Sequence, residues 1–144
     1  MSDAVRGRLA LYLSALWWGG IGLLAFVAVP LAFAHFGNPA LAGPFAAKLF
    51  TVVSWLSVAG GLALLALCRD LPAIARALPL ILLAMLCGLV QEHGVAYKIL
   101  TARATGGDLR LWHGVGSLLV LLQWLAAGRV LWLLSGRPAP ASGG

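Results

Sequence analysis

Four long apolar runs constrain this chain more than any other feature. They cover Leu9–Phe36, Phe45–Cys68, Ile74–Leu100 and Leu111–Leu134. At about 1.5 Å of rise per residue, each run can cross the ~30 Å hydrocarbon core of a bilayer as an α-helix. Hydrophobic residues make up 62% of the 144 residues and charged residues only 10%, which is more apolar surface than a soluble domain of this size can bury. The sequence therefore predicts an all-α integral membrane protein.

Short polar connectors separate the four runs. The first is Gly37-Asn38-Pro39, the second is Arg69–Pro72, and the third lies within Arg103–Arg110. Connectors this short make neighbouring helices antiparallel. We therefore expect one domain over residues 1–136, a four-helix antiparallel bundle with helices at about 9–36, 45–68, 74–100 and 111–134. The tail, residues 137–144, has little apolar content and is expected to be disordered.

The basic residues are scattered singly along the chain, next to the ends of the apolar runs. With the N-terminus inside, the cytoplasmic side holds Arg6, Arg8, Arg69, Arg76, Arg129 and Arg137, and the outer side holds Lys48, Lys98, Arg103 and Arg110. This bias, with an even number of spans, predicts a bacterial inner-membrane protein with both termini in the cytoplasm. The net charge of +6 is too dispersed to predict nucleic-acid binding. The expected partners are the lipid bilayer and other membrane proteins or further copies of the chain.

Small residues mark the faces on which membrane helices pack, because they allow close backbone approach. The expected packing positions are Gly19, Gly22, Pro30, Ser54, Ser57, Gly61, Gly88 and Gly116. Trp124 or Trp132 is expected at the lipid-facing surface.

One polar group does not fit this packing pattern. Gln91, Glu92 and His93 follow one another on the third helix, and Glu92 lies about 9 Å inside its outer end. An ionised carboxylate at that depth needs a partner, and its own helix offers no cation three or four residues away. We therefore expect Glu92 to point into the bundle, near His113, with Lys48 or Arg110 as the next candidates.

Three functions are open for this outer-side cluster. Its members can pair and fix the helix register, in a non-enzymatic accessory or structural protein, which is the leading hypothesis. Alternatively, His93, His113 and His35 can bind copper or haem iron, although no two of these histidines share a helix. The third possibility is a proton or small-solute path through Glu92 and His113. The sequence contains no familiar catalytic motif, which does not favour an enzyme.

Several short motifs resemble a known membrane family. They are Leu16-Trp17-Trp18-Gly19-Gly20, the stretch Phe26–Phe33, Leu41-Ala42-Gly43 leading to Lys48-Leu49-Phe50, and His113-Gly114. Together they resemble the bacterial family called domain of unknown function 4149, which is similar to transmembrane-protein-205-like proteins. The first-helix motif is also similar to copper-resistance D membrane proteins. The resemblance covers Leu9 to Leu134 and implies four inner-membrane helices without an established activity. The sequence departs from the expected pattern at Ser117, four residues after His113.

Overall fold

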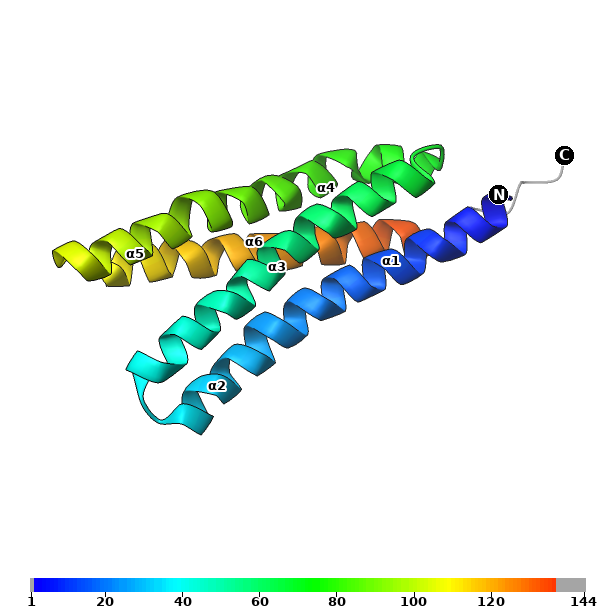
Figure 1. Cartoon of the computed structure of the whole chain (residues 1–144). Coiled ribbons are helices and arrows are strands. Elements are labelled where there is room, and N and C mark those ends of the chain that lie inside the picture. Colours follow the sequence, from blue (N-terminus) through cyan, green and yellow to red (C-terminus); the bar gives the residue numbers. More distant parts are fainter. Residues whose placement is uncertain (1, 137–144) are drawn as a thin grey trace, which may run out of the picture.

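A computed structural model of the chain describes residues 2–136. It consists of α1 (Asp3–Leu23), η1 (Leu24–Ala28), α2 (Val29–Phe36), α3 (Pro39–Cys68), α4 (Pro72–Val90), η2 (Gln91–Val95), α5 (Ala96–Thr105) and α6 (Leu109–Ser135). Because η1 and η2 continue their neighbours, the elements form four helices long and apolar enough to cross a membrane (Figure 1). The prediction of an all-α membrane bundle is confirmed. The expected disordered tail, 137–144, lies outside the described residues.

The helices extend beyond the predicted apolar runs because local signals set their ends. The side chain of Asn38 accepts a hydrogen bond from the backbone N–H of Ala40 at 2.8 Å, and Asp108 accepts one from Leu111 at 2.9 Å. Each is an N-cap that satisfies a free helical donor. Gly37 and Gly106 have φ values of 59° and 76°, and they end α2 and α5 in the left-handed conformation that favours glycine. Hydropathy alone does not detect these caps.

Two of the four spans contain a π-helical segment. In η1 the N–H of Val29 bonds to the carbonyl of Leu24, five residues back, and in η2 the N–H of Ala96 bonds to Gln91. Pro30 follows η1 and has no N–H to offer the preceding turn, which explains the shifted bonding there. The structure offers no comparable cause for η2.

The core is concentrated toward one end of the bundle, which we call the closed end. It contains the start of α1, the α3–α4 turn and the end of α6. Small and branched apolar side chains fill it, among them Ala10, Leu64, Ile74, Ala77, Ile81, Ala127 and Val130. At its surface Arg6 contacts Asp70 at 3.3 Å, linking the start of α1 to the α3–α4 turn. The described residues nearest to both termini therefore lie at this end.

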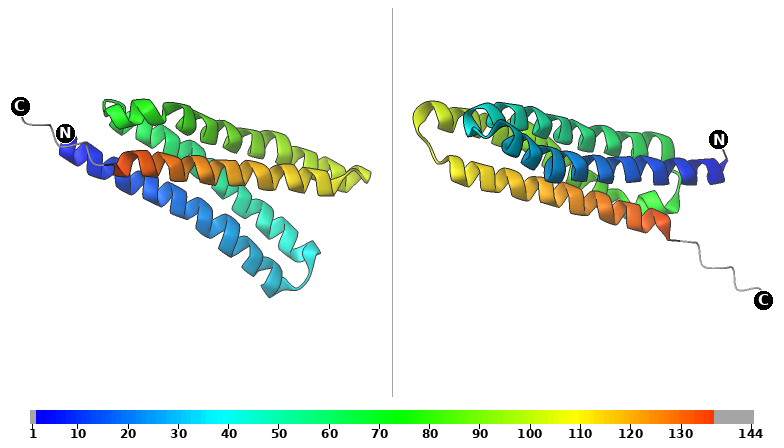
Figure 2. Two further views of the ribbon diagram at one scale, coloured as in Figure 1. Left: turned by 180° about the vertical axis from the view of Figure 1, so that it is seen from behind. Right: turned by 90° about the horizontal axis from the view of Figure 1, so that it is seen from below.

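The four spans form two hairpins, one of α1, η1, α2 and α3 and the other of α4, η2, α5 and α6. At the opposite end, which we call the splayed end, these two hairpins diverge. The tip formed by α2 and α3 points away from the tip formed by α5 and α6 in Figure 1 and in the left panel of Figure 2. The segment η2 still packs against both α3 and α6, whereas α5 beyond it packs mainly against α6. The hairpins thus separate just past η2.

Two tryptophans and two glycines join the first and last helices. A Cβ at Gly128 would lie 2.9 Å from Nε1 of Trp18, and a Cβ at Gly22 would lie 3.1 Å from Nε1 of Trp124. Each ring therefore occupies the space left by a glycine on the opposite helix. The two rings stack with their centroids 5.6 Å apart. Trp132 is 69% exposed and faces outward.

The predicted contact face of the first helix needs correction. Gly19 is exposed and a Cβ there would meet nothing within 4 Å, and Pro30 is also exposed. The bulky Trp17 is 1% exposed and donates a hydrogen bond from Nε1 to Oγ of Ser57 at 3.3 Å. With Trp17 turned inward, Gly19 lies about 200° around the helix and points away.

The other predicted packing positions lie at buried contacts. Ser54, Ser57, Gly61, Gly88 and Gly116 are all buried. A Cβ at Gly61 would meet the side chain of Met85 at 2.5 Å, and one at Gly88 would meet the backbone oxygen of Ser54 at 2.8 Å. Glycine at these positions allows α3 and α4 to approach closely.

Candidate functional site

A cleft of about 910 Å³ lies between the two hairpins at the splayed end. Its walls come from α2, α3, η2, α5 and α6. Apolar side chains form much of the wall, including Phe33, Phe50, Ile99, Leu100 and Leu109. The polar lining consists of Lys48, Thr51, Gln91, Glu92, His93, Tyr97, Arg103, Arg110, His113 and Ser117. The volume is within the usual range of small-molecule sites. Most of the polar residues expected at the outer side are therefore brought together around one space.

The floor of the cleft is formed by η2. Gln91 is only 5% exposed, and its Oε1 has no hydrogen-bond partner among the described residues. Gly116 lies across from it on α6. A Cβ at Gly116 would lie 3.3 Å from Nε2 of Gln91, so the glycine leaves room for the Gln91 amide. A buried acceptor without a donor is unusual and costs free energy.

Glu92 lies beside Gln91 and is half-buried. It accepts a hydrogen bond from Oγ1 of Thr51 on α3 at 3.3 Å. The predicted direct pairing of Glu92 with His113, Lys48 or Arg110 is not found: every ion pair within 4 Å in residues 2–136 lies at the closed end. Those three candidates line the same cleft at a greater distance: Lys48 lies on the other hairpin, and His113 and Arg110 lie on α6 of the same hairpin. Thr51, not singled out in the sequence, is the partner.

Three cations line the cleft, one from each of α3, α5 and α6. They are Lys48, Arg103 and Arg110, and Glu92 is the only carboxylate among the lining residues. Arg103 reaches across to the other hairpin, since its Nη2 lies 3.0 Å from the position of a Cβ on Gly43. Lys98 lies elsewhere, with Nζ 5.8 Å from the ring centroid of Trp112. The lining therefore carries net positive charge.

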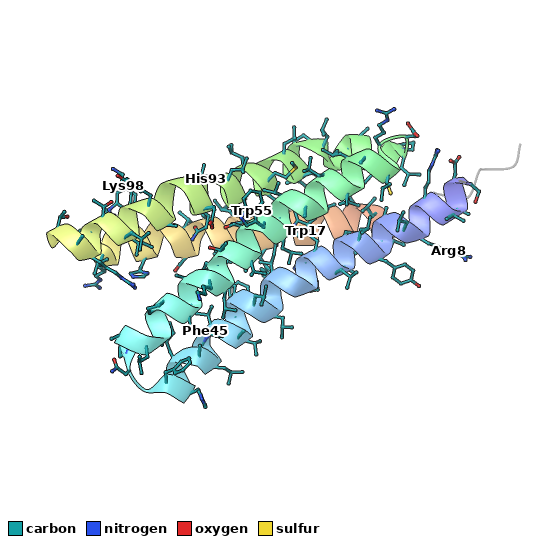
Figure 3. The ribbon with its side chains drawn as sticks, in the orientation of Figure 1. Arg8, Trp17, Phe45, Trp55, His93 and Lys98 are labelled. Atoms are coloured by element: carbon teal, nitrogen blue, oxygen red, sulfur yellow. The ribbon has the colours of Figure 1, made fainter. Side chains whose placement is uncertain are left out.

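The three histidines are not brought to one point. His93 and His113 both line the cleft, whereas His35 does not and instead contacts the ring of Phe36. His93 meets Trp55 edge to face at 6.2 Å, and both lie on adjoining helices in Figure 3. Within residues 2–136, no three His, Cys, Asp or Glu side chains are grouped so that they could hold a metal ion. The proposed three-histidine ligand set is thus not assembled.

A buried polar layer lies below the floor, and the sequence reasoning missed part of it. Gln123 on α6 is fully buried and donates from Nε2 to the carbonyl of Leu119 at 3.3 Å. Its Oε1 and the hydroxyl of Ser54 have no partner among the described residues. A lone amide within the apolar run Leu118–Ala127 was the available signal, because polar groups at this depth are costly and seldom incidental.

These features define a multi-pass membrane protein built from two helical hairpins around a cleft. The chain belongs to the family described as Domain of unknown function (DUF4149), whose model matches residues 12–108. The family predicted from the sequence motifs is therefore confirmed. The match ends before α6, so Gly116 and Gln123 lie outside it. Neither the curated proteins nor the solved structures provide a match. The similarity to transmembrane-protein-205-like and copper-resistance D proteins stays a prediction.

Proposed function

We propose that this protein binds an anionic amphiphile, a membrane lipid with a negatively charged head group, in the cleft between its hairpins. One observation carries the proposal: apolar walls and three cations, set against one carboxylate, surround the same cavity of about 910 Å³. The apolar walls suit acyl chains, and the cations suit an anionic head group. In this view the protein is a non-enzymatic accessory component of its membrane.

The blind end of the cleft favours binding over conduction. Beyond the buried polar layer of Gln123 and Ser54, the helices are closed by the apolar cluster that includes Ile21, Leu64, Ile81 and Val130. A polar solute that reached Gln91 would find no continuous polar route to the closed end in this conformation, and crossing apolar protein is costly. The proton or small-solute path is therefore the less supported alternative.

The location is part of the proposal. We place the protein in a bacterial inner membrane with both termini in the cytoplasm and the cleft open toward the outer side. Arg6, Arg8, Arg69 and Arg76 at the closed end support this orientation. An alkaline phosphatase fusion after residue 136 should be inactive, and one at Gly106 should be active. The opposite pattern would contradict the orientation.

Lipid competition tests the binding proposal. Purified protein in nanodiscs should retain phosphatidylglycerol over phosphatidylcholine in native mass spectrometry. The double substitution Arg103→Gln and Arg110→Gln should weaken phosphatidylglycerol binding roughly ten- to thirtyfold, because each cation near an anionic lipid contributes about 1 kcal/mol.

Lys98→Gln is the matched control, since it removes one positive charge from the same end of the protein but not from the cleft. Equal binding of the two lipids by the parent would overturn the proposal. So would a Lys98→Gln variant that loses as much affinity as the double variant. A haem absorption band or stoichiometric copper would support the alternative site at His93 and His113 instead.

A further inference from the structure

We infer that the floor of the cleft is a second subsite, in which Gln91 and Glu92 accept hydrogen bonds from a donor group on the ligand's head group. The donor is a hydroxyl or an ammonium, and the cations nearer the rim bind the anion of the same head group. The inference rests on the proposed function, because it specifies which part of an anionic amphiphile reaches the floor.

The amide of Gln91 provides the first argument. Gln91 is only 5% exposed and lines the cleft, and its Oε1 has no hydrogen-bond partner among the described residues. Gly116 leaves space beside the amide, since a Cβ at that position would lie 3.3 Å from Nε2. This oxygen has almost no accessible surface, so the amide must turn toward the cleft for a ligand N–H or O–H to bond to it. That bond would remove the cost of leaving the oxygen unpaired.

The carboxylate of Glu92 provides the second argument. A carboxylate has about four acceptor positions, and Thr51 Oγ1 is its hydrogen-bond donor in the structure, at 3.3 Å. Glu92 also faces the cavity and has no cation within 4 Å among residues 2–136. Its remaining acceptor positions are therefore available to the ligand.

The spacing along α3 indicates which subsite lies deeper in the cleft, the cationic rim or the acceptor floor. Lys48 precedes Thr51 by three residues, which is about 4.5 Å along the helix axis. The cation lies on the side of the splayed end, and the Thr51–Glu92 pair lies on the side of the floor. The phosphate would lie near Lys48 and the terminal donor near Glu92 and Gln91.

The other unpaired acceptors do not belong to this subsite. Oε1 of Gln123 and the hydroxyl of Ser54 are not part of the cleft lining. The Gln123 oxygen lies 3.4 Å from the Cβ position of Gly88, inside the bundle. The floor subsite is therefore limited to the two side chains of η2 that reach the cavity as acceptors.

Four lipids with identical chains, compared in nanodiscs by competitive native mass spectrometry, test the inference. Phosphatidylmethanol and phosphatidylglycerol are both anionic, but only the second has head-group hydroxyls. Phosphatidylcholine and phosphatidylethanolamine are both zwitterionic, but only the second has N–H donors. We expect the donor-bearing member of at least one pair to bind about tenfold more tightly, as one added hydrogen bond would give. The pair that shows the preference identifies the donor as hydroxyl or ammonium.

Substitutions at the floor locate the preference. Gln91→Leu should reduce it to about twofold or less. If Gln91→Leu does not fold, Gly116→Ala displaces the amide by the few tenths of an ångström that its 3.3 Å contact requires and should also reduce the preference. Lys98→Gln should keep it.

The outcomes separate this inference from the function on which it rests. If the parent prefers anionic over zwitterionic lipids but binds both members of each pair equally, the floor subsite is refuted and the cationic rim stands. A donor preference that survives both floor variants also refutes the subsite. If the parent protein shows no preference for anionic over zwitterionic lipids, the proposed function itself is overturned.

Discussion

The contact between α3 and α4 at Gly88 yields the sharpest stability prediction. A Cβ at this position would lie 2.8 Å from the backbone oxygen of Ser54, about 0.6 Å short of the 3.4 Å at which ordinary contact begins. A backbone oxygen held in a helix cannot rotate away, so the two helices would have to separate. We expect Gly88→Ala to lower the free energy of unfolding by about 1–3 kcal/mol, the usual cost of overpacking.

Unfolding in mixed micelles, titrated with sodium dodecyl sulfate and followed by circular dichroism, measures this loss. Gly19→Ala is the matched control, because its new methyl group meets no atom within 4 Å and alanine favours the helix by up to about 1 kcal/mol. Gly61→Ala should cost less than Gly88→Ala, since the obstacle at Gly61 is the flexible side chain of Met85. The reasoning is refuted if Gly88→Ala unfolds at the same detergent fraction as Gly19→Ala.

Four further substitutions can be measured in the same titration. Trp124→Ala should cost about 1–3 kcal/mol because it removes an aromatic stack and empties the space over Gly22. Trp132→Ala, at an exposed position, should change stability by less than about 0.5 kcal/mol. Equal losses in the two variants would contradict the assignment of faces. Thr51→Val should cost about 1–3 kcal/mol because it removes the hydrogen bond to Glu92, and an unchanged midpoint would show that the bond contributes nothing. Arg6→Gln should cost less than about 1 kcal/mol, as expected of a pair at the surface, and the loss should shrink in high salt.

The spans and turns of this fold could be predicted from the sequence because hydropathy accumulates over many residues. Each apolar run has the length of a bilayer crossing, and glycine, proline and asparagine mark the connectors between runs. The family also followed from motifs distributed over several helices. These predictions do not change when a predicted helix end is wrong by a few residues.

The rotation of each helix about its axis was harder to predict, because one residue changes it by about 100°. The sequence Gly19-Gly20-Ile21-Gly22 contains too many small residues for spacing to select a face. The choice is made by Trp17, whose buried ring packs on Gly60 and bonds to Ser57. Which residue bonds to Glu92 depends on the rotation of two helices about their axes. Thr51 could therefore not be identified from the residue spacing along either helix.

The polar cluster was predicted at the correct end, but the cleft was not. Predicting that Lys48, Glu92 and Arg110 lie at similar depths requires only the helix rise. Whether they touch or surround a cavity depends on the angle between the hairpins, which is set by packing at positions such as Gly88, and on the contact of η2 with α6 at Gly116. Contacts of that kind have no local sequence signature.

The π-helical segment η2 makes the length of the third span as important as its composition. A π turn accommodates one residue more than the α-helical turn it replaces. Deleting one residue between Gln91 and Val95 would turn the π turn into an α turn and leave α5 in nearly the same orientation. Deleting one residue of α5 between Ala96 and Lys98 is not absorbed in this way and would rotate the rest of α5 by about 100° relative to α4. Arg103 would then turn away from Gly43, while Gln91 stayed near Gly116. Natural variants of this protein should therefore tolerate the loss of one residue within η2 more readily than the loss of one residue in α5.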